Sequence, residues 1–279
     1  MVNSISSSAT IITPVLNGAS TIATTLKSVG MQGESVREHL IIDGGSEDET
    51  EVLVKNAGGV ARFTRCPGMN QAAAVNEGIR LAKGSFIGWL NADDFYFDRW
   101  VVGAVADCFG SDASARVIYG DCVYIDGTGR ITDLRVTPPF NRDRLSRYSY
   151  LPQPAVFVRC DLAKSVPLNT AYEFVMDSDW FLRLASLCDF RHIRRFVAVF
   201  REHPGQKMHK LGRSVYTAEV DAIRGLSSGR IRRHERVMDM MTNLRARLAG
   251  RMRRLRIGPG AFEDLRLMIK SEGDSKPCA

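Results

Sequence analysis

Short apolar segments that end in polar residues alternate with helical segments along the first third of the chain. The apolar segments carry the β-branched and aromatic side chains of buried strands, and they span Thr10–Val15, His39–Ile42, Val60–Thr64 and Phe86–Leu90. Helices are predicted between them, over residues 20–29, 46–56 and 70–82. This alternation predicts an α/β fold with a doubly wound, mostly parallel sheet, in which ligands bind at the loops that follow the strands.

The pattern is less regular after residue 94. A hairpin turn at Asp126–Gly129 is predicted to join two strands. The other predictions are strands at residues 117–119, 123–125, 130–136, 156–158 and 196–200, and helices at residues 98–109, 177–187, 211–226 and 231–255. We therefore expect further strands after the parallel part and a helical extension at the C-terminal end.

The composition is that of a soluble globular protein, with 44% hydrophobic and 25% charged residues in a chain of 279. No segment approaches the ~18 consecutive apolar residues of a membrane span. The segment Met1–Ser8 lacks the basic start of a signal peptide. The 6 cysteines are scattered without a C-x-x-C pair, which is typical of reduced core cysteines. These features predict a cytoplasmic protein.

The net charge of +7 is concentrated near the C-terminus. Residues 230–256 contain ten arginines against only Glu235 and Asp239, and the remainder is about neutral. This distribution disfavours a general nucleic-acid-binding surface. Apolar residues from Val237 to Leu255 recur at three- and four-residue spacing, which predicts a basic amphipathic helix. Such a helix can lie on the anionic inner face of the cytoplasmic membrane, or it can pack on its own domain or a partner subunit.

Two adjacent carboxylates, Asp93 and Asp94, end the most apolar of the predicted strands. Buried neighbouring carboxylates repel each other unless a cation or hydrogen-bond donors lie between them. At the carboxyl end of a parallel strand they predict a divalent metal site for a phosphorylated ligand. The alternative is that both residues stabilise the start of a helix.

Three further polar positions are candidates for chemistry. Asp43 follows the second strand, where it can accept a hydrogen bond from a nucleobase or a ribose hydroxyl, or else brace the Gly44-Gly45 turn. Asp177 and Asp179 begin a helix, where one of them can act as a general base for a hydroxyl group or both can stabilise the helix.

The polar segment 201–207 follows the last predicted strand. His203 can be a metal ligand or a structural residue, and Arg201 or Lys207 can meet a diphosphate. The P-loop, G-x-G-x-x-G, G-x-S-x-G and H-E-x-x-H motifs are all missing from the sequence. Their absence disfavours a kinase, a dehydrogenase, a serine hydrolase and a zinc protease.

Together these segments resemble the family 2 glycosyltransferases of the GT-A fold, in particular the bacterial polysaccharide-type members. The resemblance is carried, in the family's order, by Thr13–Asn17, Leu40–Asp48, Gly68, Asn76–Ile79, Ala82–Gly84, Gly88–Asp94, Gln153-Pro154, Met176–Trp180 and Phe200–His203. It implies a GT-A domain over residues 1–210, with a nucleotide-binding half at about 9–94 and an acceptor half at about 95–210. Residues 211–279 would then be a helical basic extension and tail.

The resemblance also implies roles for individual residues. The nucleotide-sugar donor is expected to contact Pro14, Asn17, Asp43, Asn76, Asn91, Ala92, Asp93 and Asp94. Among these, Asp43 is implied to hold the base, and Asn91 to meet the ribose. Mg²⁺ or Mn²⁺ bridging the diphosphate would be bound by Asp93 and His203. Asp177 falls at the family's catalytic base, and the acceptor is expected to contact Gln153, Asp179 and Trp180.

The implied activity is inverting, metal-dependent transfer of a sugar from a nucleoside diphosphate donor to a hydroxyl of a glycan or glycolipid, in cell-surface polysaccharide biosynthesis. Three positions depart from the family pattern, namely Asn91 in place of Asp, Met176 in place of Glu, and Ala73 in place of a polar or acidic residue. The first two leave open a non-catalytic sugar-nucleotide-binding or scaffold protein of the same fold. A sugar nucleotidyltransferase is less favoured, because residues 17–20 lack a basic glycine-rich phosphate loop.

Overall fold

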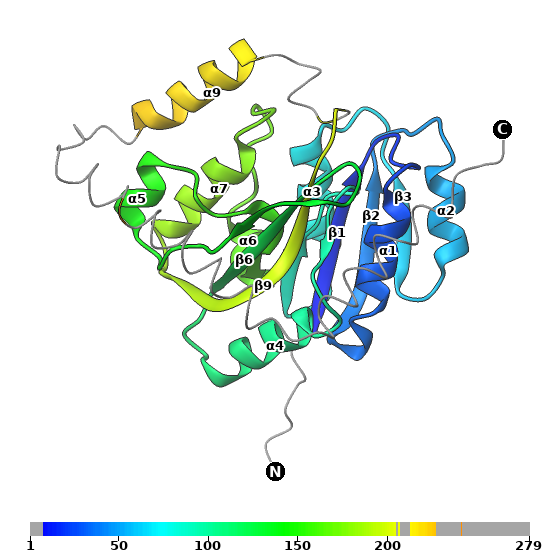
Figure 1. Cartoon of the computed structure of the whole chain (residues 1–279), viewed down its shortest axis with the longest axis horizontal. Coiled ribbons are helices and arrows are strands. Elements are labelled where there is room, and N and C mark those ends of the chain that lie inside the picture. Colours follow the sequence, from blue (N-terminus) through cyan, green and yellow to red (C-terminus); the bar gives the residue numbers. More distant parts are fainter. Residues whose placement is uncertain (1–7, 205, 207–212, 227–240, 242–279) are drawn as a thin grey trace.

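The computed structural model describes residues 8–204, 206, 213–226 and 241. Strands within this part of the chain form one curled sheet in the order β3-β2-β1-β4-β8-β6-β9-β5, with β7 paired to β6 (Figure 1). The strands are β1 (Ala9–Val15), β2 (Val36–Asp43), β3 (Ala61–Arg65), β4 (Phe86–Trp89), β5 (Phe95–Tyr96), β6 (Val117–Asp126), β7 (Ile131–Arg135), β8 (Val156–Arg159) and β9 (Phe190–Glu202).

Helices follow or join these strands. They are α1 (Ile22–Gly30), α2 (Thr50–Ala57), α3 (Gln71–Leu81), α4 (Val101–Ser111), α5 (Arg142–Arg147), α6 (Cys160–Ser165), α7 (Met176–Ala185) and α9 (Arg213–Leu226), with single 3₁₀ turns η1 (Gly33–Ser35) and η2 (Gln153–Ala155). The predicted α/β fold is therefore confirmed, with each element of the first half within a few residues of its expected place.

The first half of the sheet is parallel, as predicted. β1 pairs in parallel with β2 and with β4, and β2 pairs in parallel with β3. Neighbouring residues of β1 point to opposite faces, so that Ile11 packs with α4 and Ile12 packs with α3. Both faces are buried, which explains why these strands appear in the sequence as continuous apolar runs.

The second half of the sheet is mixed. β8 runs antiparallel to β4 and β6, and β9 runs parallel to β6. The two short strands predicted at 117–119 and 123–125 are one strand, β6, because the polar interruption is buried inside the sheet: Asp121 is fully buried and accepts a hydrogen bond from Thr137. The predicted hairpin is confirmed by the antiparallel pairing of β6 with β7.

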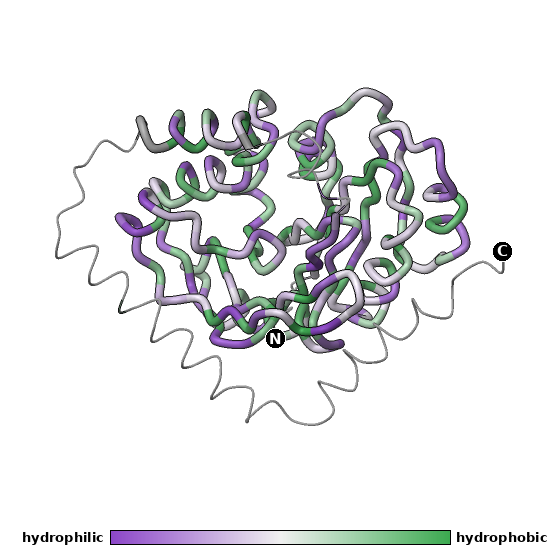
Figure 2. Tube along the Cα trace, turned by 45° about the horizontal axis from the view of Figure 1, so that its top comes forward, coloured by the Kyte–Doolittle hydropathy of each residue, from purple (hydrophilic) through white to green (hydrophobic). Residues whose placement is uncertain are grey.

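The predicted helix at residues 211–226 is present as α9, which lies near the start of α7 (Figure 1). Hydrophobic and hydrophilic residues alternate along it (Figure 2). The second predicted C-terminal helix, at 231–255, lies outside the described residues, apart from residue 241. The basic appendage and the boundary at residue 210 therefore stay predictions. None of the described helices is both long enough and apolar enough to cross a bilayer.

Candidate functional site

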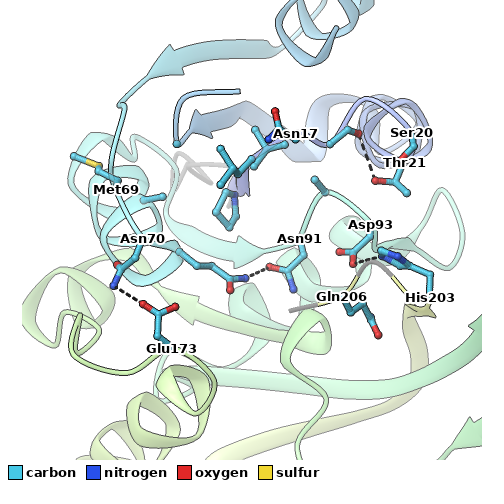
Figure 3. A pocket seen from close by; sticks show the side chains of 18 of the residues that line it. Asn17, Ser20, Thr21, Met69, Asn70, Asn91, Asp93, Glu173, His203 and Gln206 are labelled. Carbon is cyan, nitrogen blue, oxygen red and sulfur yellow. Dashed lines mark hydrogen bonds and ion pairs between the residues drawn. The ribbon is translucent and has the colours of Figure 1, made fainter. Parts of the chain in front are cut away.

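A pocket of about 590 Å³ opens where the loops after β1, β2 and β4 meet the end of β9. Six residues singled out in the sequence line it together, namely Pro14, Asn17, Asn91, Ala92, Asp93 and His203. Figure 3 shows Asn17 above the pocket, Asn91 near its centre, and Asp93 with His203 on one side. The carboxyl ends of the strands thus bring together the groups that the sequence placed there.

Asn17 ties the loop after β1 to the loop after β2. Its side-chain oxygen accepts a hydrogen bond from the backbone N–H of Glu47 at 2.9 Å, and its own N–H donates to Oγ of Ser46 at 2.7 Å. The backbone of Asn17 has a φ of 53°, a left-handed conformation that asparagine tolerates better than most residues. The two bonds hold the chain in this conformation at the wall of the pocket.

Asp43 lies beneath the loop and outside the pocket lining. Its carboxylate accepts hydrogen bonds from the backbone N–H groups of Gly45, at 3.1 Å, and Ser46, at 2.9 Å, and from the Ser46 hydroxyl. The residue has no exposed surface. The structure therefore shows the turn-bracing role that the sequence left open, and the contact of Asp43 with a base stays a prediction.

Asn91 is the centre of a network of side-chain amides. Its oxygen accepts from the indole N–H of Trp89 and from Nε2 of Gln71, both at 2.9 Å. Its nitrogen donates to Oε1 of Gln153 at 3.0 Å and to Oδ2 of Asp94 at 3.3 Å. These four bonds use the full hydrogen-bonding capacity of the amide. A ribose hydroxyl can be bound here only in exchange for one of them.

Gln153 has a supporting position in the same network. Besides accepting from Asn91, it donates through Nε2 to the backbone oxygen of Trp89 at 2.6 Å. It does not line the pocket. The predicted acceptor contact of Gln153 therefore finds no support in its position, because both ends of its amide are bound within the protein.

Only one of the two adjacent carboxylates faces the pocket. Asp94 is completely buried and accepts a hydrogen bond from the backbone N–H of Arg201 at 3.2 Å. Burial, and then the charge of Asp93, raises the pKa of Asp94 well above its usual range. The side chain of Asp94 is bound by protein donors and lies outside the pocket lining, so its predicted contact with the nucleotide sugar stays a prediction. Arg201 is also buried, against the backbone oxygen of Asp93, and Lys207 lies outside the described residues.

Asp93 and His203 face each other at the pocket wall (Figure 3). Nε2 of His203 lies 3.0 Å from Oδ2 of Asp93, and each side chain is 25% exposed. No group of three or more His, Cys, Asp or Glu side chains suited to a metal ion occurs among the described residues. One carboxylate and one imidazole nevertheless fit Mg²⁺ or Mn²⁺, because such ions commonly take one or two protein ligands and complete their shell with phosphate oxygens and water.

Asp177 occupies the first turn of α7. Its carboxylate is partly buried and accepts the backbone N–H of Ser178 at 2.7 Å. Burial raises the pKa of Asp177 to about 6. A carboxylate with such a pKa is suited to take a proton near neutral pH. Asp177 itself does not line the pocket, and the lining residue nearest to it in the sequence is Glu173, four positions earlier.

The other two acceptor candidates on α7 are structural. Asp179 is 7% exposed and accepts from Nε of Arg183 at 2.9 Å, one helical turn further along. Trp180 is 2% exposed and donates its indole N–H to the backbone oxygen of Val166 at 2.6 Å. Both side chains are bound within the protein and lie outside the pocket lining, so the predicted acceptor contacts of Asp179 and Trp180 stay predictions.

Asn76 joins α3 to the loop that leads to α7. Its amide accepts the N–H of Leu168 at 2.8 Å and donates to the carbonyl of the same residue at 2.9 Å. It does not line the pocket. Its contribution to the site is therefore indirect, through the position of residues 168–175.

Several residues of the pocket escaped the sequence analysis. They are Leu16, Gly18, Met69, Asn70, Gln71, Glu173 and Gln206, among others. Asn70 could have been found as the N-cap of α3, where its side chain accepts from Ala73. Glu173 carries no local signal, since it reaches the pocket through a long loop, where it accepts a hydrogen bond from Nδ2 of Asn70 at 3.4 Å (Figure 3).

Comparison with known proteins gives a consistent result. The model of the family described as "Glycosyl transferase family 2" matches residues 10–146. A PGL/p-HBAD biosynthesis glycosyltransferase of Mycobacterium tuberculosis is 29% identical over 202 residues, which cover 70% of this chain and 77% of that protein. An uncharacterized glycosyltransferase of Rickettsia felis is 30% identical over 131 residues, covering 46% of this chain and 21% of that protein.

Solved structures share the fold at low sequence identity. S. aureus TarS 1-349 in complex with UDP-GlcNAc superimposes with a TM-score of 0.61 at 16% identity, over 82% of this chain and 69% of that one. Glucosyl-3-phosphoglycerate synthase from Mycobacterium tuberculosis, in complex with Mn²⁺, UDP and glucosyl-3-phosphoglycerate, gives a TM-score of 0.58 at 16% identity, over 77% and 78% of the chains. In two other TarS structures the chain spans 60% and 37% of the length.

Proposed function

Because the chain belongs to glycosyltransferase family 2 and has the GT-A fold, we propose that its pocket transfers a sugar from a nucleoside diphosphate donor to an acceptor hydroxyl. The observation that carries this proposal is the Asp93–His203 pair, which faces the pocket at the end of the parallel half of the sheet. The pair lies where a diphosphate would meet the strand ends.

Asp93 and His203 are the residues that would hold Mg²⁺ or Mn²⁺ in this pocket. When bound, the ion would neutralise the negative charge that develops on the diphosphate leaving group. The Mn²⁺ in the glucosyl-3-phosphoglycerate synthase complex supports this assignment by analogy. With Asp94 buried, Asp93 is the single carboxylate of this sequence motif that is available to such an ion.

The donor is proposed to be a uridine diphosphate sugar. Both structural relatives were solved with UDP or UDP-GlcNAc, which supports a uridine diphosphate sugar over a guanosine diphosphate sugar as the donor. The pocket offers an apolar surface to a base, because Leu16 is 62% exposed and Met69 is 38% exposed at its wall. Gly44 lies beside both, and a Cβ there would come within 3.2 Å of the backbone oxygen of Met69. A small residue at this position keeps the apolar surface accessible.

Asp177 is proposed as the general base. A sugar hydroxyl is a weak nucleophile, and a positioned carboxylate takes its proton as the oxygen attacks the anomeric carbon. The raised pKa of Asp177, at about 6, favours proton transfer at neutral pH. Attack from the face opposite the leaving diphosphate inverts the anomeric centre. Inversion is therefore part of the proposal.

A glycan or glycolipid is the proposed acceptor, in the biosynthesis of cell-surface polysaccharide. The support is the similarity to a relative named for PGL/p-HBAD biosynthesis. Contact of residues 230–256 with an anionic membrane surface belongs to the same proposal, because ten arginines in that segment would be attracted to it.

The test combines nucleotide binding with turnover. Calorimetric titration of UDP, GDP and CDP, with and without Mn²⁺, is made on the wild type and on Asp93→Ala. We expect UDP to bind best, with a metal dependence that Asp93→Ala loses. Release of UDP from UDP-glucose and UDP-GlcNAc then measures turnover, which Asp177→Asn should abolish while UDP binding is retained.

Asp189→Asn is a matched control, because Asp189 is a carboxylate that is 85% exposed and lies outside the pocket lining. Failure of folded wild-type protein to bind any nucleotide would refute the donor site. Equal turnover in Asp177→Asn and the wild type would refute the assigned base. Nucleotide binding with no turnover towards any donor or acceptor would favour the scaffold alternative.

A further inference from the structure

Helix α9 presents one carboxylate to three consecutive backbone N–H groups of a distant segment. Glu219 accepts from the N–H of Glu173 and of Phe174, each at 2.8 Å, and from that of Val175 at 3.2 Å. Both carboxylate oxygens take part, one towards Glu173 and the other towards the next two residues. The three bonds join segments that are separated by more than 40 positions in the chain.

These N–H groups stand at the start of α7. Val175 is the N-cap residue of the helix, and its own side chain makes no capping hydrogen bond. Free N–H groups at a helix start need acceptors, and a negative charge there is favourable. Of the three N–H groups only that of Val175 belongs to the helix start, and the other two belong to the residues just before it. Glu219 therefore places a carboxylate from α9 at the segment that leads into α7 and fixes that segment.

A second contact supports the first. The ring of Tyr216, one turn before Glu219 on α9, meets the ring of Phe174 edge to face, with the centroids 6.1 Å apart. Two side chains on one face of α9, Tyr216 and Glu219, thus contact the same short segment, residues 173–175. Figures 1 and 2 both show α9 lying alongside the part of the molecule that carries α7.

The segment 173–175 contains one acidic residue of the pocket lining, Glu173, and precedes the proposed base Asp177. Glu173 lines the pocket and accepts from Nδ2 of Asn70, which also donates to the backbone oxygen of Thr170 at 2.8 Å. Asp177 follows the segment by two residues. A displacement of residues 173–175 would therefore move both carboxylates relative to the nucleotide half of the pocket.

We propose that Glu219 is a positioning residue, which holds residues 173–175 so that Glu173 and Asp177 stand correctly against the donor. This inference rests on the proposed function for its catalytic meaning. Helix α9 then helps to position the residues of the transferase site, although it follows the segment that the family model matches. None of the three hydrogen bonds of Glu219 involves the pocket residues that follow β1, β2 and β4.

The test compares Glu219→Ala and Glu219→Gln with the wild type. Asp221→Ala is the matched control, because Asp221 is an exposed acid two residues along the same helix. Hydrogen exchange at the amides of residues 173–175, affinity for UDP with Mn²⁺, and the kcat and KM of UDP release from UDP-glucose and UDP-GlcNAc are measured for each.

In Glu219→Ala we expect the three amides to exchange at least ~10-fold faster, and kcat to fall about 10- to 100-fold, since a shift of about 1 Å at a reacting group can cost 100-fold. The affinity for UDP should stay within about twofold. Glu219→Gln keeps one acceptor oxygen and should lie between the wild type and Glu219→Ala, while Asp221→Ala should match the wild type.

Unchanged exchange in Glu219→Ala, or unchanged kcat, would overturn the proposal. A parallel loss of UDP affinity and kcat would also overturn it, because that result would assign Glu219 a role in overall stability. Wild-type protein that neither binds UDP nor releases it from a donor would refute the proposed function, and the exchange data would still decide whether Glu219 holds the segment.

Discussion

Nε2 of His203 lies 3.0 Å from Oδ2 of Asp93, although 110 residues separate the two in the chain. The short strand β5 explains their meeting. It follows Asp94 at once and pairs antiparallel with β9, with Phe95 opposite Val199. The end of β9 is therefore carried to the loop after β4, and a histidine joins a carboxylate at the wall of the pocket.

The first prediction concerns metal-dependent nucleotide binding by this pair. His203→Ala should weaken the binding of UDP in the presence of Mn²⁺ by at least about 10-fold, because it would remove one of the two proposed protein ligands. Asp93→Ala should weaken it further, because it would remove the charged one of the two. Calorimetric titration of UDP with and without Mn²⁺ measures both effects.

The metal-free titration is the control for this prediction. Without Mn²⁺, both variants should bind UDP as weakly as the wild type does, since the pair would act through the ion. If His203→Ala bound UDP with Mn²⁺ as tightly as the wild type, the histidine would be a structural partner of Asp93.

The second prediction is that rising pH lowers the contribution of Asp177 to stability and raises the turnover that depends on Asp177. Burial raises the pKa of Asp177 to about 6 from 3.8, so the unfolded chain ionises first as the pH rises. The contribution of Asp177 to stability should therefore fall between about pH 4 and pH 6, by about 1–3 kcal/mol, and stay level above this window. Turnover should rise through the same window, because the base works as the anion.

Unfolding free energies of the wild type and Asp177→Asn, measured from pH 3.5 to pH 7.5, test this expectation. The variant cannot ionise at this position, so its free energy of unfolding should increase relative to that of the wild type as the pH rises. A constant difference between the two proteins over this range would mean that Asp177 titrates equally in the folded and unfolded states.

The parallel half of the fold could be predicted because its signals are local. The strands β1, β2 and β4 are buried on both faces and appear as apolar runs, and Asn70 caps the helix α3 within the same part of the chain. The apolar run of β4 therefore predicted where this strand ends, and it placed Asp93 at that end. Position in the sequence could not tell Asp93 from Asp94, because their difference in burial depends on the backbone of Arg201 in a remote strand.

The missed features depend on contacts between distant segments. β9 begins at Phe190, well before the predicted residues 196–200. The prediction missed its earlier part because that part carries charged side chains such as Arg191 and Arg195. These side chains pair with Asp112 and Asp98. Neither the hydrophobic periodicity nor a sequence motif predicts such a strand. Glu173 and Glu219 escaped detection for the same reason, since their partners are backbone groups and side chains far away in the chain.

The third prediction is that Asn91→Asp destabilises the protein, although it restores the acidic residue of the family pattern. The amide of Asn91 donates to Asp94 and to Gln153, and a carboxylate can donate to neither. It would also place a second charge against a buried carboxyl group. We expect a loss of about 2–4 kcal/mol in the free energy of unfolding at pH 7, measured by denaturant titration.

Asn91→Ser is the comparison for this change, because it also removes the amide N–H groups that donate to Asp94 and Gln153 but adds no charge. The charged variant should be the less stable of the two. Equal stability of Asn91→Asp and the wild type would show that the amide network tolerates a carboxylate at its centre.

The fourth prediction separates the two roles considered for Asp43. Replacement by alanine leaves the N–H groups of Gly45 and Ser46 without their acceptor, in a turn that the fold buries at this point. Since hydrogen bonds to a charged group each contribute about 1.5–3 kcal/mol, Asp43→Ala should lower the free energy of unfolding by roughly 3 kcal/mol or more. The preference for UDP over CDP, measured by calorimetry at a temperature where the variant is folded, should be unchanged, because the buried carboxylate does not line the pocket. A variant of normal stability that no longer distinguished UDP from CDP would instead place Asp43 in contact with the base, and the turn would then owe its shape to Ser46 and Asn17 alone.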